Sequence, residues 1–218
     1  MVAEELPRLR ITEIFHSLQG ETSAVGRPAT FIRLTGCPLR CRYCDTDYAF
    51  HGGVWQSLAE ILERVEERPG QLVVVTGGEP LAQGPATLHL LSALCELGRE
   101  VFLETSGALP VDQVDERVVK ILDLKTPGSG ESGKNLWSNL ASLRPRDQVK
   151  FVLCDRADYD WAVQVLQGHD FGGAEILFSP SYGQLPLQDL AQWILADRLP
   201  VRLQIQLHKL IWGDIPGH

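Results

Sequence analysis

Short apolar runs alternate with longer amphipathic segments along most of this chain. Residues 72–75 are apolar without interruption, which is typical of a parallel strand buried on both faces. Residues 9–15 alternate apolar and polar side chains instead, the pattern of a strand with one buried face. Similar short runs predict further strands over residues 29–34, 101–104, 118–122, 149–153, 175–178 and 201–206.

Four segments between these runs have the spacing of helices. Ser57 and Glu60 form a capping box that satisfies the first helical N–H groups, and apolar residues follow on one face until Pro69. A second helix is expected over residues 85–97, with Gly98 in the position that follows a helix end. Helical patterns over residues 158–167 and 187–196 complete the set.

The alternation of strands and helices places the chain in the α/β class. Short connections between the elements imply parallel strands joined by right-handed crossovers. About six or seven strands are too few for a complete eight-stranded barrel, so the pattern indicates an incomplete barrel or a doubly wound sheet. We expect a single domain over residues 1–218, a length that provides a sizeable core.

Polar or glycine-rich segments follow five of the apolar runs. In both architectures, ligands bind at the C-terminal ends of the strands. Five such segments at one rim therefore indicate a binding site more strongly than any one of them alone. They cover residues 36–46, 76–80, 104–107, 123–127 and 179–182.

Composition narrows the class of partner. The formal net charge is −8 and no basic stripe is present, which argues against a protein that grips duplex nucleic acid through its phosphates. The N-terminus lacks the features of a signal peptide, and no apolar run approaches the ~20 residues that a membrane helix needs. We therefore expect a cytoplasmic protein with no direct nucleic-acid or membrane partner, in which thiols stay reduced.

Three cysteines stand close together in the first of the polar segments. Cys37, Cys41 and Cys44 have the spacing C-x₃-C-x₂-C, and three thiolates are one short of the four that usually hold a cubane iron–sulfur cluster. Such a cluster would keep one iron open to a substrate or cofactor. A structural zinc site with His51 as fourth ligand is the alternative, although its spacing is unusual for zinc. A disulfide with a spare thiol is disfavoured by the reducing compartment.

At this point the sequence resembles the radical S-adenosylmethionine superfamily. The three cysteines, with Tyr43 before the last of them, are similar to its cluster loop, and the Gly-Gly-Glu-Pro run at residues 77–80 is similar to its methionine-binding loop. The resemblance implies a [4Fe–4S] cluster whose fourth iron is chelated by S-adenosylmethionine, and a radical that abstracts hydrogen from a substrate. A surrounding barrel would exclude water from this chemistry.

Within that superfamily, the chain closely resembles the 7-carboxy-7-deazaguanine synthase family. The similar segments are residues 13–21, 31–37, 44–46, 123–127, 150–152 and 206–209. The resemblance implies an incomplete TIM-like barrel of about six parallel strands and a radical lyase of queuosine and 7-deazapurine biosynthesis. It would convert 6-carboxy-5,6,7,8-tetrahydropterin to 7-carboxy-7-deazaguanine with release of ammonia. The implied partners are Mg²⁺, an electron donor of the flavodoxin type, and a second copy of the chain in a homodimer.

The same resemblance assigns residues to the substrate. Those are Leu18, Gln19, Gly20, Arg33, Thr76 and Pro216, with Gln19, Arg33 and Thr76 as catalytic residues. A charge on the apolar strand that carries Arg33 is costly unless it is paired. Its planar fork suits a carboxylate, which is either the substrate's or that of Glu13 or Glu21.

For the cofactors, the resemblance assigns the cysteines to the cluster and Thr46 to Mg²⁺, which usually takes few protein oxygens. The S-adenosylmethionine residues would be Tyr43, Asp45, Gly78, Asp123, Leu124, Lys125, Ser179, Pro180, Ser181 and Tyr182. At the C-terminus the chain departs from the family pattern, because Gly217 and His218 follow Pro216.

Two alternatives remain at this point. One is a radical activase that acts on a partner protein, which would use the same cluster chemistry but does not explain the segment over residues 13–21. The other is a non-catalytic zinc or iron–sulfur module, which would bind metal without cleaving S-adenosylmethionine.

Overall fold

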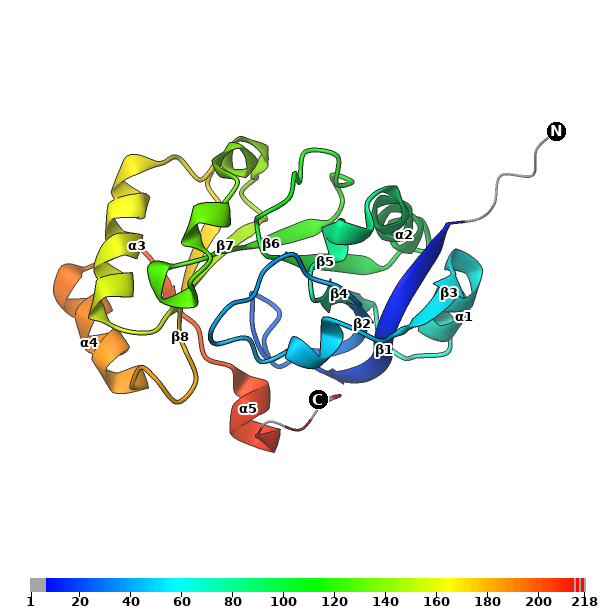
Figure 1. Ribbon diagram of the computed structural model, residues 1–218, viewed down its shortest axis with the longest axis horizontal. Helices are drawn as coiled ribbons and strands as arrows, with labels where there is room; N and C mark the ends of the chain where they lie inside the picture. The colour runs from blue at the N-terminus through cyan, green and yellow to red at the C-terminus, as the bar shows by residue number, and fades with distance from the viewer. Residues whose placement is uncertain (1–6, 214, 216, 218) are drawn as a thin grey trace.

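The computed structural model describes residues 7–213, 215 and 217, which form a single nine-stranded sheet in the order β3-β1-β2-β4-β5-β6-β7-β8-β9 (Figure 1). The strands are β1 Arg8–Leu18, β2 Pro28–Leu34, β3 Val54–Ser57, β4 Leu72–Gly77, β5 Glu100–Thr105, β6 Val119–Leu124, β7 Gln148–Leu153, β8 Glu175–Pro180 and β9 Arg202–Leu203. The strands β2, β4, β5, β6, β7, β8 and β9 run parallel to one another, whereas β1 is antiparallel to both of its neighbours, β2 and β3. The sheet is open, with β3 and β9 at its edges, and the described helices that connect its parallel strands pack on one of its faces only, so the predicted incomplete barrel is confirmed and the doubly wound sheet is not.

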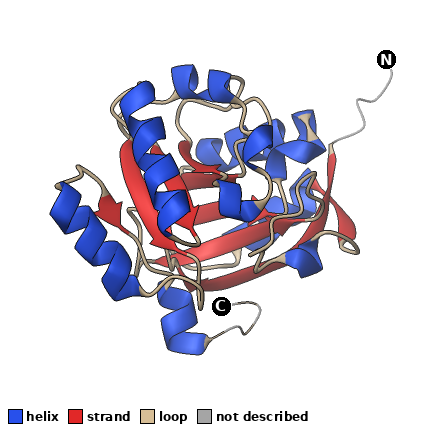
Figure 2. Ribbon diagram, turned by 60° about the vertical axis from the view of Figure 1, so that its left-hand side comes forward, coloured by secondary structure: helices blue, strands red, loops and turns tan. Residues whose placement is uncertain are grey.

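Helices connect the parallel strands and cover the outer face of the sheet (Figure 2). They are α1 Leu58–Glu66, α2 Pro85–Glu96, α3 Arg156–Gly168 and α4 Leu187–Asp197. The short α5 Leu207–Trp212 follows the last strand, and the 3₁₀ turns are η1 Asp47–Ala49, η2 Pro80–Gln83, η3 Pro127–Ser129, η4 Ser132–Lys134 and η5 Trp137–Ser142. The predicted capping box is confirmed, since the Ser57 hydroxyl accepts from the Glu60 N–H and the Glu60 carboxylate accepts from the Ser57 N–H. Gly98 has the left-handed backbone expected after α2, with φ of 73°.

In β2, β4, β5 and β6, alternate residues belong to two different apolar clusters. Val73 and Val75 of β4 pack into the large core between the sheet and the helices. Val74, between them, belongs to a smaller cluster on the inner face together with Phe31 and Phe102. Because strand side chains alternate with a period of two, a single strand therefore contributes to both faces.

The inner face changes from apolar to polar toward the C-terminal ends of the strands. Four strands, β2, β4, β5 and β6, each carry a buried apolar residue and, two positions later, a polar one: Phe31 then Arg33, Val74 then Thr76, Phe102 then Glu104, and Ile121 then Asp123. Lys150 of β7 continues this polar row and is the register partner of Asp123. This row forms the rim where barrels of this kind bind their ligands.

Several element boundaries differ from the prediction. β6 extends to Leu124 and β8 to Pro180, so residues expected in loops close their strands. β9 has two residues rather than six, since only Arg202 and Leu203 pair with β8, and one further bond runs from the Gln204 N–H to the Phe178 carbonyl. β3 and α5 were not predicted, since β3 is a short, exposed edge strand and α5 has no side-chain cap at its start.

Across the residues that the structure describes, every helix is too short or too polar to cross a lipid bilayer.

Candidate active site

A cavity of about 550 Å³ opens at the C-terminal ends of the strands. The predicted residues that line it are Leu18, Gln19, Gly20, Arg33, Cys37, Cys41, Tyr43, Cys44, Asp45, Thr46, Thr76, Gly78, Asp123, Lys125, Ser181 and Tyr182. Five loops that are far apart in the sequence therefore meet at one rim, as the position of the polar segments led us to expect.

Three predicted cofactor residues lie elsewhere. The Leu124 side chain packs in the large outer core, and Ser179 and Pro180 close β8 with Ser179 almost fully buried. None of the three is among the residues that line the cavity. Pro216 is outside the described residues, so its predicted substrate contact stays a prediction.

The cysteine loop is held in place from both ends. The Gly36 N–H donates to the Ala49 carbonyl at 2.8 Å, and Gly36 has a φ of 100° that glycine tolerates best. Further along, the Arg40 N–H donates to Glu131 Oε1 at 2.7 Å and the Arg42 N–H to the Ser129 carbonyl at 3.0 Å. The loop therefore has a fixed path between β2 and the η3–η4 segment.

The three thiols fit the ligand set of a cluster. All three are unpaired and line the cavity, and burial raises their pKa values, that of Cys41 to about 11. The negative charge of one thiolate disfavours ionisation of the other two cysteines. A cationic cluster bound between the three would favour the thiolate form of each. Lys125 also favours the thiolate form of each.

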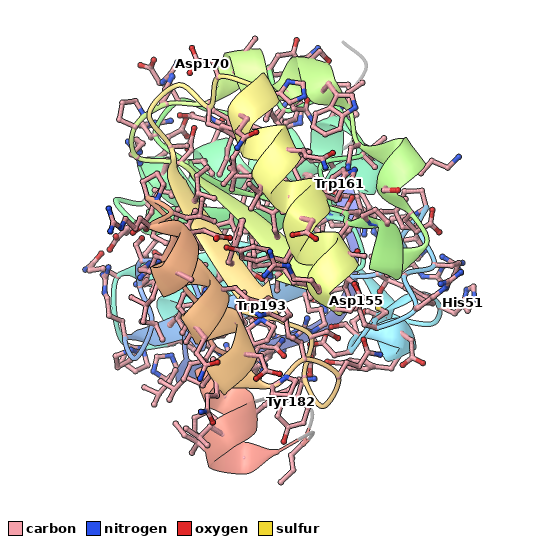
Figure 3. All side chains as sticks on the ribbon, turned by 90° about the vertical axis from the view of Figure 1, so that its left-hand side faces the viewer. His51, Asp155, Trp161, Asp170, Tyr182 and Trp193 are labelled. Atoms are coloured by element: carbon pink, nitrogen blue, oxygen red, sulfur yellow. The ribbon has the colours of Figure 1, made fainter. Side chains whose placement is uncertain are left out.

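The zinc alternative receives little support from the geometry. In the described part of the chain, no group of three His, Cys, Asp or Glu side chains could hold a single metal ion. The suggested fourth ligand, His51, is exposed and lies at the outer edge of the molecule (Figure 3). It does not line the cavity that the three thiols share.

The Gly-Gly-Glu-Pro run brings backbone close to the cysteine loop. A Cβ at Gly78 would lie 2.2 Å from the Gly36 carbonyl oxygen, and one at Gly77 would lie 2.2 Å from that of Leu34. Only glycine permits this approach, and it leaves both residues on the cavity wall. This run can therefore present backbone groups to a ligand bound at the cluster.

Glu79 of the same run has a structural role. Its side chain is fully buried, and its carboxylate accepts from the Leu81 N–H at 2.9 Å, the Ser106 N–H at 2.7 Å and the Thr105 hydroxyl at 2.9 Å. These bonds tie the end of β4 to the end of β5 and keep the glycines in place.

Two buried polar atoms on the wall of the cavity have no protein partner. Among the described residues, these atoms are the Tyr43 hydroxyl and Asp123 Oδ1. The other oxygen, Asp123 Oδ2, lies 3.1 Å from the Lys125 ammonium. A ligand with hydrogen-bond donors and a carboxylate, such as S-adenosylmethionine, would satisfy this set of groups.

Arg33 has the internal partner that we considered. Its Nε lies 2.7 Å from Glu13 Oε1, which also accepts from the Tyr48 hydroxyl at 2.9 Å. Its guanidinium carbon lies 5.7 Å from the centroids of both the Phe15 and the Tyr48 rings. The side chain also lines the cavity, so pairing with Glu13 orients the guanidinium toward a ligand as well as neutralising it.

Glu104 begins the polar segment over residues 104–107 that the sequence placed at the rim, but the contacts of its side chain were not predicted. The Gln19 amide donates to Glu104 Oε1 at 3.1 Å, and the Thr76 hydroxyl donates to Glu104 Oε2 at 2.9 Å. The two predicted substrate residues are therefore joined through this carboxylate. Its place two positions after Phe102 on an inner strand face is the signal that could have identified it.

Thr46 and Asp45 form a polar corner beside the last cysteine. The Thr46 hydroxyl donates to Asp45 Oδ1 at 2.8 Å, and Asp45 Oδ2 lies 3.4 Å from the Lys209 ammonium. Although burial opposes ionisation of Asp45, Lys209 and these hydrogen bonds lower its pKa to about 2. An ionised carboxylate next to a hydroxyl oxygen is a donor pair that suits Mg²⁺.

The short helix α5 closes one side of the cavity. The Leu207 N–H donates to the Gly20 carbonyl at 2.9 Å, and a Cβ at Gly20 would meet the His208 ring at 2.1 Å. The Lys209 ammonium lies 5.0 Å from the centroid of the Tyr182 ring, which lies beside α5 in Figure 3. His208 thus lines the cavity, and its membership of the similar segment over residues 206–209 was the only sequence signal for it.

The fold and the cysteine-lined cavity define a member of the radical SAM superfamily. A family model with that description matches residues 31–125. The solved structure of QueE from Escherichia coli has the same fold, with a TM-score of 0.78 over 92% of this chain and 95% of that chain, at 24% identity.

Curated relatives then specify the family. A 7-carboxy-7-deazaguanine synthase of Chlorobaculum tepidum is 50% identical over 94% of both chains. One of Koribacter versatilis is 43% identical over 94% of this chain and 97% of its own length. This chain belongs to the 7-carboxy-7-deazaguanine synthase family.

Proposed function

We propose that this protein converts 6-carboxy-5,6,7,8-tetrahydropterin to 7-carboxy-7-deazaguanine and releases ammonia. Membership of the family supports the reaction. The observation that supports it within this chain is a single cavity with three thiols on one wall and the Gln19–Glu104–Thr76 set with Arg33 on another. Residues 1–218 would carry the whole activity as one domain.

Cys37, Cys41 and Cys44 would hold the [4Fe–4S] cluster, and S-adenosylmethionine would lie between Tyr43, Gly78 and the Asp123–Lys125 pair. When bound, these groups supply a carbon radical that removes a hydrogen atom from the substrate. The protein's part is to exclude water and to orient both ligands. Glu79 contributes by holding the glycine loop, and Asp123 by offering its unpartnered oxygen to a donor.

The other wall of the cavity suits a flat, carboxylated heterocycle. The Phe15 and Phe31 rings are stacked with centroids 4.9 Å apart, and both line the cavity. Arg33 would bind the substrate carboxylate through the part of its guanidinium that Glu13 does not occupy. Gln19, Glu104 and the backbone of Leu18 and Gly20 would bind the ring edge, which presents both donors and acceptors.

We place Mg²⁺ at the Thr46–Asp45 corner, where a substrate carboxylate could complete its ligands. In this position the ion would orient the substrate and stabilise charge during ring contraction.

We also propose the setting in which the enzyme works. It would act on a small molecule in the cytoplasm as a homodimer, with no nucleic-acid or membrane partner. A one-electron donor of the flavodoxin type would reduce the cluster.

The test is anaerobic reconstitution with iron and sulfide, followed by incubation with S-adenosylmethionine, a reductant and 6-carboxytetrahydropterin. We expect mass spectrometry to find 7-carboxy-7-deazaguanine, and to find none with Cys41→Ala. Cleavage of S-adenosylmethionine without conversion of the pterin would instead support the activase alternative. A reconstituted protein that cleaves no S-adenosylmethionine would support the non-catalytic module.

A further inference from the structure

Lys150 occupies a buried position between the two ligand-binding parts of the cavity. Its ammonium lies 2.6 Å from Glu21 Oε2 and 3.5 Å from Asp123 Oδ2, and its side chain is 11% exposed. Glu21 directly follows the predicted substrate segment, and Asp123 belongs to the predicted S-adenosylmethionine segment. A single cation therefore joins the loop after β1 to the end of β6.

The two carboxylates do not depend on Lys150 equally. Asp123 has a second cation, Lys125, at 3.1 Å. Within the described residues, Lys150 is the cation that pairs with Glu21, whose side chain is 9% exposed. A buried carboxylate that loses its partner cation is strongly disfavoured. Loss of Lys150 would therefore disturb the substrate side more than the cofactor side.

Glu21 in turn fixes the orientation of a predicted catalytic side chain. Its backbone N–H donates to Gln19 Oε1 at 3.1 Å, which leaves the amide nitrogen of Gln19 directed at Glu104. If the amide were reversed, two donors would face each other at the Glu21 N–H and two acceptors would face each other at the Glu104 carboxylate. The position of Glu21 therefore decides which group Gln19 presents to the cavity.

The loop itself has a second attachment to the same strand. Gln148, two residues before Lys150 on β7, donates to the Ser23 hydroxyl at 2.5 Å and accepts from the Ser23 N–H at 3.0 Å. These bonds involve no charged group. They would keep Ser23 attached to β7 when the Lys150–Glu21 pair is broken, so the loss would displace Glu21 locally and would not release the whole loop.

We propose that Lys150 is a positioning residue for the pterin substrate, which it serves by neutralising Glu21 and so holding the Gln19 amide in its binding orientation. The inference rests on the proposed function, because it concerns the substrate end of the same cavity. Lys150 acts through Glu21 and Gln19 and not by direct contact with the substrate.

The experiment compares Lys150→Met, Glu21→Gln and the double variant in the reconstituted holoenzyme. We expect Lys150→Met to raise the KM for 6-carboxytetrahydropterin at least tenfold and to leave the KM for S-adenosylmethionine within about threefold of wild type. It should also release more 5′-deoxyadenosine per product formed. When the substrate is misplaced, the radical takes its hydrogen atom from another source and no product results. In the double variant no carboxylate is left unpaired, so its pterin KM should return to that of Glu21→Gln alone.

A matched control is available at the opposite end of the strands. The Lys120 ammonium of β6 lies 2.9 Å from Asp147 Oδ2, and both side chains are at least as buried as those of the Lys150–Glu21 pair. Lys120 does not line the cavity. Lys120→Met measures the general cost of breaking a buried ion pair, and we expect it to lower the unfolding temperature without changing the pterin KM.

Three results would overturn the proposal. The first is a Lys150→Met enzyme with the wild-type pterin KM. The second is a double variant as defective as Lys150→Met, which would show direct contact of Lys150 with substrate. The third is an equal rise in the pterin KM with Lys120→Met. If Lys150→Met does not fold, the comparison of the double variant with Glu21→Gln still decides the matter, and absence of turnover in wild type would refute the proposed function instead.

Discussion

The two faces of the sheet use the same strands for opposite purposes. On the outer face, residues such as Leu103 and Val75 are fully buried in one large apolar core beneath the helices. On the inner face, their neighbours Glu104 and Thr76 bond one another in the cavity. The difference teaches that stability and chemistry are separated here by a single residue step along a strand, because successive side chains point to opposite faces.

The inner face is itself divided along the strand axis. Near the N-terminal ends it is closed by apolar residues such as Val74 and Phe102, and near the C-terminal ends it carries the polar row. Helix-covered apolar surface stabilises the sheet, so charged groups can be concentrated at one rim without loss of the fold. Four predictions test this separation.

The largest expected effect concerns the cysteine wall. Cys37→Ala, Cys41→Ala and Cys44→Ala should each abolish the visible absorbance of the cluster and all turnover, because each thiolate binds one iron. Absorbance spectroscopy and product analysis after anaerobic reconstitution measure both. Cys95→Ala, on the outer side in α2, is the matched control and should retain both signals. Full turnover in any of the first three variants would refute the cluster assignment.

The outer face should affect stability alone. Leu103→Ala removes a fully buried side chain and should lower the free energy of unfolding by about 2–5 kcal/mol. Urea denaturation measures this loss, and turnover per cluster should stay at the wild-type value. A change in the pterin KM comparable to that of an inner-face variant would contradict the separation of the two faces.

Arg33→Ala tests the inner face by its effect on catalysis. The loss of a charged contact to substrate should lower kcat/KM by the equivalent of about 2–4 kcal/mol. Steady-state kinetics with the pterin measure it. Glu13→Gln breaks the internal pair but keeps the guanidinium, so it should cost less than Arg33→Ala. Equal losses in the two variants would mean that Arg33 serves only its pair with Glu13.

The smallest effect is expected at the opposite rim, where Arg27 pairs with Glu100 at the start of β5. Both side chains are more than a third exposed, so Arg27→Ala should cost under about 1 kcal/mol of stability. Hydrogen bonding to Arg27 lowers the Glu100 pKa below its ordinary value of 4.5. The contribution is therefore present above that value and is lost as the pH falls through the lower, folded-state pKa.

Urea midpoints of wild type and Arg27→Ala at pH 7 and pH 3 measure this contribution. We expect the difference between the two proteins to shrink at pH 3. A difference that persists in acid would show that the Arg27 side chain stabilises the protein by packing and not by its charge.

Most of the sheet could be predicted from local pattern. The run over residues 72–75 and the capping box at Ser57 are local signals, and the structure confirms both. The edges were harder, since β3 and β9 pair on one side only and carry little apolar pattern. In the site, the three cysteines and the two glycines could be recognised because each group lies within one short segment, where the chemistry constrains the spacing.

Glu104, Lys150 and His208 could not be assigned in that way. Each acquires its place from a partner distant in the chain: Glu104 from Gln19, Lys150 from Glu21, and His208 from Gly20. A charged residue near the end of a strand looks the same in sequence whether it faces solvent or a cavity. Its pairing depends on which strands become neighbours.

The sequence by itself determined the class of fold, the three-thiol loop and the glycine loop beside it, because strand periodicity and short-range spacing are properties of local chain geometry. The tertiary structure decided which residues face the cluster loop across the cavity. Parallel strand order brings the C-terminal ends of β5, β6 and β7 to one rim, and the loop after the antiparallel strand β1 meets their inner faces in the cavity. There the charges pair with one another because they are buried. The substrate side of the site is therefore a consequence of strand order, whereas most of the cofactor side is formed by residues that are close together in single loops.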